Sequence, residues 1–112
     1  MPHPLFDRYA IKMKPLSERP NKVVFEHDKV LPESTPGAFD EIGKKTLAET
    51  TERIRSARKE NRPVMLTFGA HAIKNCLAPV IIRLMERGWI THLATNGAGV
   101  IHDWELAFQG ET

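Results

Sequence analysis

Several features that are common in secreted and membrane proteins are missing from this sequence. It has one cysteine, Cys76, among 112 residues, so no internal disulfide can form, and this cysteine usage suits a reducing compartment. No apolar run approaches the roughly 18 residues that are needed to cross a bilayer. The first residues, Met1 to Pro4, lack the basic and apolar regions of a signal peptide. We therefore expect a cytoplasmic protein with no membrane partner.

The chain also has little net charge. Its 16 lysines and arginines and its 14 acids leave a formal charge of +2, which gives no reason to expect a nucleic-acid partner. The charges are unevenly distributed, because residues 1–62 hold 13 of the basic residues and 10 of the acids. Residues 63–112 are therefore the part in which a hydrophobic core can form. A chain of 112 residues has room for one domain.

Proline is concentrated at one end of the chain. Six of the eight prolines lie in residues 1–37, where they exclude long helices and favour extended or turning chain. Two short apolar stretches in this region, residues 9–13 and 23–25, could be edge strands or could lie across another surface. We interpret residues 1–37 as a proline-rich N-terminal arm that packs on something else, with a neighbouring subunit as one candidate.

The remaining residues, 38–112, have the pattern of an α/β segment. Apolar spacing predicts three helices, over residues 38–61, 72–87 and 100–109, and apolar runs predict two strands, over residues 64–68 and 89–95. Pro79 must either kink the second helix or mark a restart after a short first turn. Strands separated by a helix are almost always parallel, and the unbroken apolar run of the first strand favours one covered on both faces. We expect a parallel sheet with flanking helices and a buried Cys76.

The sharpest local feature is a glycine-rich turn after the second predicted strand. Its sequence is Asn96-Gly97-Ala98-Gly99. Glycine permits positive φ and lets a ligand approach the backbone, and the N-terminus of the helix that follows suits a phosphate or carboxylate. Gly69 stands at the equivalent end of the first strand, and the carboxyl ends of parallel strands border one ligand crevice. We predict a nucleotide-like ligand at this edge, with plain loop geometry as the alternative.

Polar side chains near this turn are candidates for chemistry. His102, Asp103 and Glu105 fall in the first turns of the last helix, where they could orient a substrate, donate a proton or hold an amine. The alternative for the two acids is helix electrostatics, since acids stabilise a helix N-terminus. His71 and Asn75 belong to the other strand-end loop, so that with His102 they would surround one crevice. His92, among apolar neighbours, is interpreted as a core histidine, and we predict no metal site.

Two stretches of the sequence resemble deoxyhypusine synthase and its bacterial relatives. They are FGAHAIKN (68–75) and LMERGWITHLATNGAGVIHD (84–103), and the resemblance covers about residues 40–110. It implies a Rossmann-like NAD-binding fold, usually assembled as a tetramer with active sites at subunit interfaces. In that family NAD oxidises spermidine, and an aminobutyl group passes through an enzyme lysine to a protein lysine. The residues expected here are, for NAD, Gly69, His71, Asn75, Asn96, Gly97, Ala98 and Gly99, and for catalysis His102 and Asp103.

The sequence departs from this family at two points. Asn96 stands where the family has a threonine, and Ile101 and His102 stand where it has paired acids that reach the polyamine; Asp103 matches a family acid. A His–Asp pair suits a less cationic substrate, or proton transfer near neutral pH. The family's catalytic lysine lies in a C-terminal half that this chain does not contain. We therefore expect the N-terminal part of a larger protein, inactive by itself.

Three functions are open from the sequence. The first is the NAD-binding segment of a deoxyhypusine synthase-like aminoalkyl transferase, in a homo-oligomer that acts on a small amine or polyamine. The second is a non-catalytic binding or assembly module whose arm wraps a partner. The third is an enzyme of different chemistry on the same scaffold, acting on a small amine or amino acid with His102 as acid or base.

Overall fold

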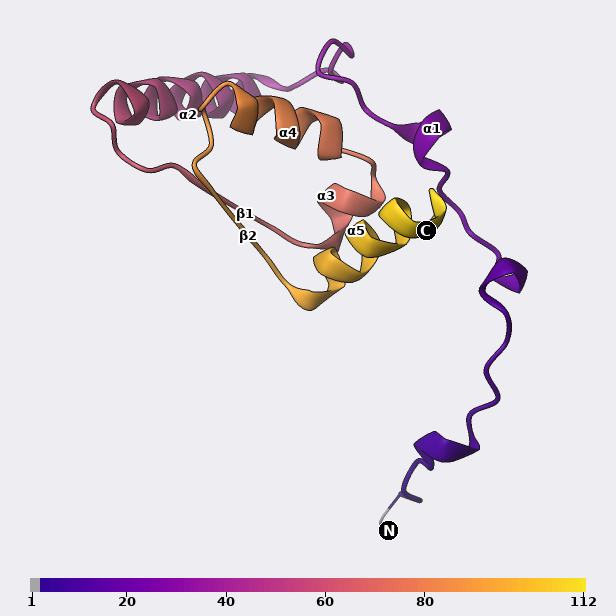
Figure 1. The fold of residues 1–112 in the computed structure, drawn as a ribbon. Coiled ribbons are helices and arrows are strands. Elements are labelled where there is room, and N and C mark those ends of the chain that lie inside the picture. The colour runs from indigo at the N-terminus through magenta and orange to yellow at the C-terminus, as the bar shows by residue number, and fades with distance from the viewer. Residues whose placement is uncertain (1–2) are drawn as a thin grey trace.

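The computed structural model describes residues 3–112 and contains helices that flank a parallel pair of strands, which is compatible with the expected α/β class (Figure 1). The elements follow in the order η1 (Arg8–Ala10), η2 (Leu16–Glu18), α1 (Phe25–Asp28), α2 (Glu41–Lys59), β1 (Met65–Phe68), α3 (Ala70–Lys74), α4 (Ala78–Glu86), β2 (His92–Thr95) and α5 (Gly97–Gln109), η denoting a 3-10 helix. Within residues 3–112, no helix is both long and apolar enough to cross a membrane.

Within residues 3–112 the sheet consists of two strands, β1 and β2. They run parallel, as predicted, and Phe68 at the end of β1 lies opposite Thr95 at the end of β2. Just before the two strands, the N–H of Val64 donates to Oγ1 of Thr91 at 2.9 Å, so the contact continues beyond their N-terminal ends. Both strands are shorter than the apolar runs that predicted them. The carboxyl ends of the two strands therefore meet at one edge, as expected.

The prediction that β1 is covered on both faces is wrong. The apolar cavity beneath α4 and α5 is lined by Phe68, Leu93 and Thr95, which occupy alternate positions of the sheet. The other alternate positions face solvent, and the side chain of Met65 keeps 62% of its surface exposed. All four residues of β2 are exposed, so the interpretation of His92 as a core histidine is also wrong.

The second predicted helix is in fact two helices, which agrees with the alternative of a restart near Pro79. Helix α3 ends at Lys74, and α4 begins at Ala78 with Pro79 in its first turn. Cys76 lies between them with a φ of 56°, in the left-handed region, so the chain changes direction there. The side chain of Cys76 is fully buried, as predicted, and this burial raises the pKa of its thiol.

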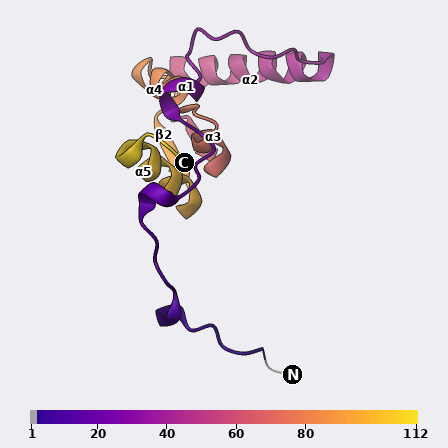
Figure 2. The ribbon, with the colours of Figure 1, turned by 90° about the vertical axis from the view of Figure 1, so that its right-hand side faces the viewer.

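The core is small and lies where α3, α4 and the start of β2 meet. Its buried apolar side chains are Ile73, Cys76, Ile81 and Ile90. Helix α3 packs against α5, and α2 lies beside α4 in both views (Figures 1 and 2). A hydrogen bond supports the position of α2 beside α4, because Nε of Arg58 in α2 donates to the carbonyl of Gly88, just after α4, at 2.7 Å.

A large area of the chain remains exposed. Its accessible surface is 9,484 Å², whereas a compact protein of this size exposes about 6,200 Å². The radius of gyration is 19.0 Å, against about 13 Å for a compact chain. Trp104 and Phe108 of α5 contribute to the excess, since they stack on each other at 4.9 Å and keep 57% and 66% of their surfaces exposed. This helix has an apolar face that its own chain does not cover.

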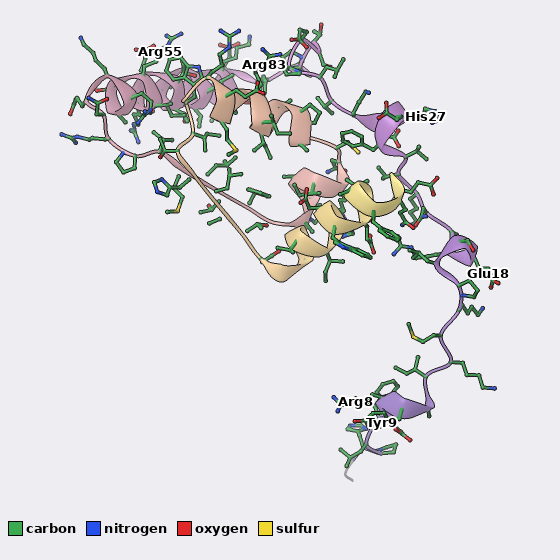
Figure 3. All side chains as sticks on the ribbon, in the orientation of Figure 1. Arg8, Tyr9, Glu18, His27, Arg55 and Arg83 are labelled. Carbon is green, nitrogen blue, oxygen red and sulfur yellow. The ribbon has the colours of Figure 1, made fainter. Side chains whose placement is uncertain are left out.

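The first part of the proline-rich arm, residues 3–18, makes a second contribution to the exposed area. Every residue of this free arm is exposed, including Leu5 at 99% and Met13 at 89%. Figure 3 shows the labelled Arg8 and Tyr9 at the far end of the free arm, away from the helices. The stretch 9–13, a candidate edge strand in the sequence, forms no strand.

The second part of the arm, residues 19–30, packs against the end of the same chain. In this docked segment, Val24 forms an antiparallel bridge with Glu111. The N–H of Phe25 donates to the carbonyl of Gly110 at 2.8 Å, and α1 begins at Phe25 instead of continuing a strand. The backbone therefore joins the docked segment to the C-terminal end of α5.

Candidate functional site

The two strand-end loops lie side by side, as the sequence predicted. Gly69 follows β1 and Asn96 follows β2, and a Cβ built on Gly69 would stand 3.6 Å from Nδ2 of Asn96. A shallow depression at this strand-end edge is lined by residues 67–69 and 94–96. Open parallel sheets bind ligands outside the carboxyl ends of their strands, so this edge is the first candidate site.

Helix α5 begins at Gly97, three residues earlier than predicted. The cause is Asn96, which caps the helix: its Oδ1 accepts from the N–H of Gly99 at 3.0 Å. The glycine-rich stretch is therefore the first turn of a helix, and neither of its glycines has a positive φ. Gly97 and Ala98 are exposed there. A Cβ built on Gly97 meets nothing within 4 Å, so a ligand can reach this backbone.

Gly99 has a different role from Gly97. It is buried, and a Cβ at this position would overlap Oγ1 of Thr95 and lie 3.3 Å from its Cβ. The absence of a side chain lets the first turn of α5 lie directly against the end of β2. Gly99 is therefore a packing residue, and it also borders an apolar cavity of about 280 Å³ between the sheet and helices α4 and α5.

His102 belongs to a polar cluster beside the middle of α5. Its Nδ1 lies 2.6 Å from Oγ1 of Thr112 and 3.5 Å from Oε2 of Glu105. The Thr112 hydroxyl donates to that same carboxylate, and Arg19 of the docked segment donates to its other oxygen at 2.5 Å. The hydrogen bonds from Arg19 and then Thr112 lower the pKa of Glu105 below its ordinary value. Glu105 also raises the pKa of Arg19.

This cluster determines which nitrogen of His102 carries the proton. An ionised carboxylate only accepts hydrogen bonds, so the single hydroxyl proton of Thr112 is directed at Glu105. The contact of His102 with the same hydroxyl oxygen therefore requires Nδ1–H as the donor. The neutral ring then carries its lone pair on Nε2, which is the arrangement of a histidine that can accept a proton.

A polar pocket of about 450 Å³ surrounds this cluster. The docked segment, the end of α3, the middle of α5 and Thr112 form its walls. Its lining residues are Arg19, Pro20, Asn21, Lys22, Val23, Lys74, Asn75, His102, Glu105 and Thr112. The structure thus places two of the predicted site residues, Asn75 and His102, in one pocket.

The other predicted site residues lie elsewhere. Asp103 borders the apolar cavity beneath α4, so it does not share a pocket with His102. His71 is exposed on α3, and the strand-end edge is bordered by Gly69 and Asn96. The crevice predicted around His71, Asn75 and His102 is therefore formed only in part, because Asn75 and His102 share a pocket and His71 lies outside it. No group of three His, Cys, Asp or Glu side chains in residues 3–112 is placed to hold a metal ion.

Sequence reasoning missed two members of the polar cluster, Arg19 and Thr112. The sequence did single out Glu105, and it meets His102 because residues three apart share one helix face. Arg19 and Thr112 had no signal in the sequence, because they reach the cluster only through the docking of segment 19–30 against the chain's end.

The sequence and the fold were compared with known proteins. No protein-family model matches the chain, and neither the curated proteins nor the solved structures contain a match to it.

Proposed function

We propose that this chain is the NAD-binding segment of a deoxyhypusine synthase-like aminoalkyl transferase with a Rossmann-like fold, and that it does not carry out the reaction alone. The observation that carries the proposal is the adjacency of Gly69 and Asn96 at the carboxyl edge of a parallel strand pair. These two positions come from the two sequence stretches that resemble the family. The reaction of this family also needs a catalytic lysine, and that lysine has no counterpart in the two stretches.

The start of α5 supports a phosphate-bearing ligand at this edge. The N–H of Gly99 is already bonded to Asn96, whereas Gly97 and Ala98 are exposed at a helix N-terminus, where backbone N–H groups favour anions. Glycine at 97 leaves the approach to this backbone open. The site is only partly enclosed, because the strand-end depression is shallow and β2 is exposed along its length. We therefore propose that further protein completes it.

Gly97→Val is expected to weaken NAD binding by at least about tenfold, or roughly 1.4 kcal/mol. The valine would meet no atom of its own chain within 4 Å, so it blocks the ligand and leaves the packing intact. Isothermal titration calorimetry with NAD measures the change, and circular dichroism checks the helix content. Gly37→Val is the matched control, because Gly37 is exposed and equally unobstructed. Unchanged affinity in Gly97→Val would contradict a dinucleotide at this edge.

The proposed enzyme is a homo-oligomer whose subunits cover the exposed apolar face of α5. Val100, Ile101, Trp104 and Phe108 each keep more than half of their surface exposed. The accessible surface exceeds that of a compact chain by about 3,000 Å², and obligate interfaces bury roughly 2,000–5,000 Å² in total. The excess includes the free arm, so both this arm and α5 are available to a second copy.

Light scattering on the purified chain is expected to give a mass above that of one chain. Trp104→Glu combined with Phe108→Glu should reduce it to the monomer, because two charges on the apolar face oppose its burial. Ile42→Glu is the control, since Ile42 is 77% exposed on α2, away from α5. A wild-type monomer at all concentrations, or equal dissociation by the control, would exclude α5 as the interface.

A second candidate function is an enzyme of different chemistry that acts on a small amine or amino acid, with His102 as general base. It is favoured by the polar cluster, because Glu105 and Thr112 hold the Nδ1–H form of His102 and leave Nε2 free to accept a proton. Many acid–base sites likewise contain a histidine that a carboxylate orients. Asn75 lies in the same pocket and could hold a polar group of the substrate.

His102→Gln is expected to reduce turnover at least about hundredfold in that case, which is the lower range for loss of a general base. The assay follows consumption of a panel of small amines and amino acids, with and without NAD. His71→Gln is the control, because His71 is exposed and outside the pocket. Equal turnover of the two variants would remove His102 from the chemistry.

A further inference from the structure

The polar pocket holds more positive than negative charge. Its charged lining side chains are Arg19, Lys22, Lys74 and Glu105, with His102 beside them. Arg19 and Glu105 form an ion pair at 2.5 Å, so their charges largely offset each other. Among the described residues, neither Lys22 nor Lys74 has a carboxylate within 4.0 Å. Counting a carboxylate on Thr112 still leaves three cations against two anions.

The walls of the pocket are fixed by bonds that do not involve these two lysine side chains. Asn21 receives a hydrogen bond from Nε of Arg19 at 2.8 Å and donates to Oε2 of Glu111 at 2.9 Å. The backbone N–H groups of Lys22 and Val23 both donate to the carbonyl of Thr112 at 3.1 Å. The ammonium groups of Lys22 and Lys74 are thus available to a ligand while the pocket keeps its shape.

This pocket is separate from the strand-end edge. Helices α3 and α5 both start at that edge, at Ala70 and Gly97, whereas the pocket lies at the end of α3 and beside the middle of α5. Glu105 is eight residues along α5 from Gly97, which corresponds to about 12 Å of helix. A ligand in the pocket would therefore leave the first turn of α5 accessible.

We propose that the polar pocket binds the phosphate group of a small organic phosphate. Lysine ammonium groups bind phosphate as compact charges, and two of them match its double charge. The amide of Asn75 adds an uncharged donor at the rim. The volume of about 450 Å³ is that of a small-molecule site and leaves room for the organic part. The same excess of cations disfavours a polyamine here.

The proposal is tested on the full chain by calorimetry and by amide chemical shifts, with inorganic phosphate and glycerol 3-phosphate as probes. Both should bind, with shifts at Lys22, Asn75 and Thr112, and glycerol 3-phosphate should bind more tightly. Lys22→Gln combined with Lys74→Gln should weaken both at least about tenfold. The matched control is Lys44→Gln with Lys45→Gln, which removes the same charge from α2 and should leave affinity within about twofold.

Four outcomes would overturn the assignment. The first is that the parent chain binds neither phosphate probe at about 10 mM, which is a very weak limit, and the second is that the α2 control weakens binding equally. The other two are that malonate binds more tightly than phosphate and that spermidine binds at the same residues. Unfolding curves check that the variant with Lys22→Gln and Lys74→Gln folds. We expect it to fold, because neither lysine forms an ion pair within the described residues. NAD titrated into the phosphate-saturated chain should still bind at the strand-end edge. Because the Gly97→Val experiment reports on that edge alone, the two proposals can fail independently.

Discussion

Gly99→Ala is expected to destabilise the protein by about 1–3 kcal/mol, the usual cost of adding a methyl group to a filled space. The new Cβ would overlap Oγ1 of Thr95, and rotation of the threonine would still leave its Cβ only 3.3 Å away, so α5 or the end of β2 must shift slightly. Alanine is the better helix former by about 1 kcal/mol, which offsets part of this loss. Urea unfolding followed by circular dichroism measures the difference.

Gly97→Ala makes the same chemical change two residues earlier, where a Cβ meets nothing. It should be neutral or slightly stabilising, so the two variants separate packing from helix propensity. Adding Thr95→Ala to Gly99→Ala should recover much of the lost stability, because it removes both Oγ1 and Cγ2. If Gly99→Ala were as stable as Gly97→Ala, the close contact of α5 with the end of β2 would be refuted.

Glu105→Gln is expected to release the docked segment, which is the other large effect. Glu105 accepts from both Arg19 and Thr112, and its side chain keeps only 13% of its surface exposed. A neutral amide loses the charge-assisted bond to Arg19 and can no longer accept with both ends. Trypsin should then cut after Lys22 much faster, and the thermal midpoint should fall by several degrees. Glu41→Gln, at an exposed pair on α2, should change neither.

The same carboxylate gives stability a defined pH dependence. The pKa of folded Glu105 lies below its ordinary value of 4.5, first because of Arg19 and then because of Thr112. The unfolded chain therefore takes up the proton first as the pH falls below about 4.5. The stabilisation is fully present above that pH and is lost as the pH falls through the lowered folded-state pKa. The difference in midpoint between wild type and Glu105→Gln should shrink in this range, and a constant difference would contradict the assigned contacts.

The sequence predicted the elements of the fold better than their boundaries. The apolar runs that end at Phe68 and Thr95 located both strands, and the intervening helical residues implied that the strands are parallel. The start of α5 was misplaced because the glycines suggested a loop, whereas the cap by Asn96 makes helical geometry favourable from Gly97 onward. The burial of β1 was overestimated, since an apolar run does not reveal how many helices are present to cover it.

The candidate site was predicted in part for a similar reason. Gly69 and Asn96 meet because parallel strands end at one edge, a rule that needs no side-chain detail. His102 and Asp103 were taken as a pair, but neighbours on a helix point about 100° apart, and the structure places them in different cavities. Arg19 could not be found from periodicity, because its position depends on the path of the docked segment.

The docked segment also implies an order of folding. The bond from Arg19 to Glu105 joins residues 86 positions apart, and that from Asn21 to Glu111 joins residues 90 apart. Closing loops of this length costs about 4 kcal/mol of chain entropy, whereas β1, α3, α4 and β2 assemble from nearby residues. The segment therefore docks last, after α5 is complete. The polar pocket does not exist before that step, so a molecule bound in it would hold the two ends of the chain together.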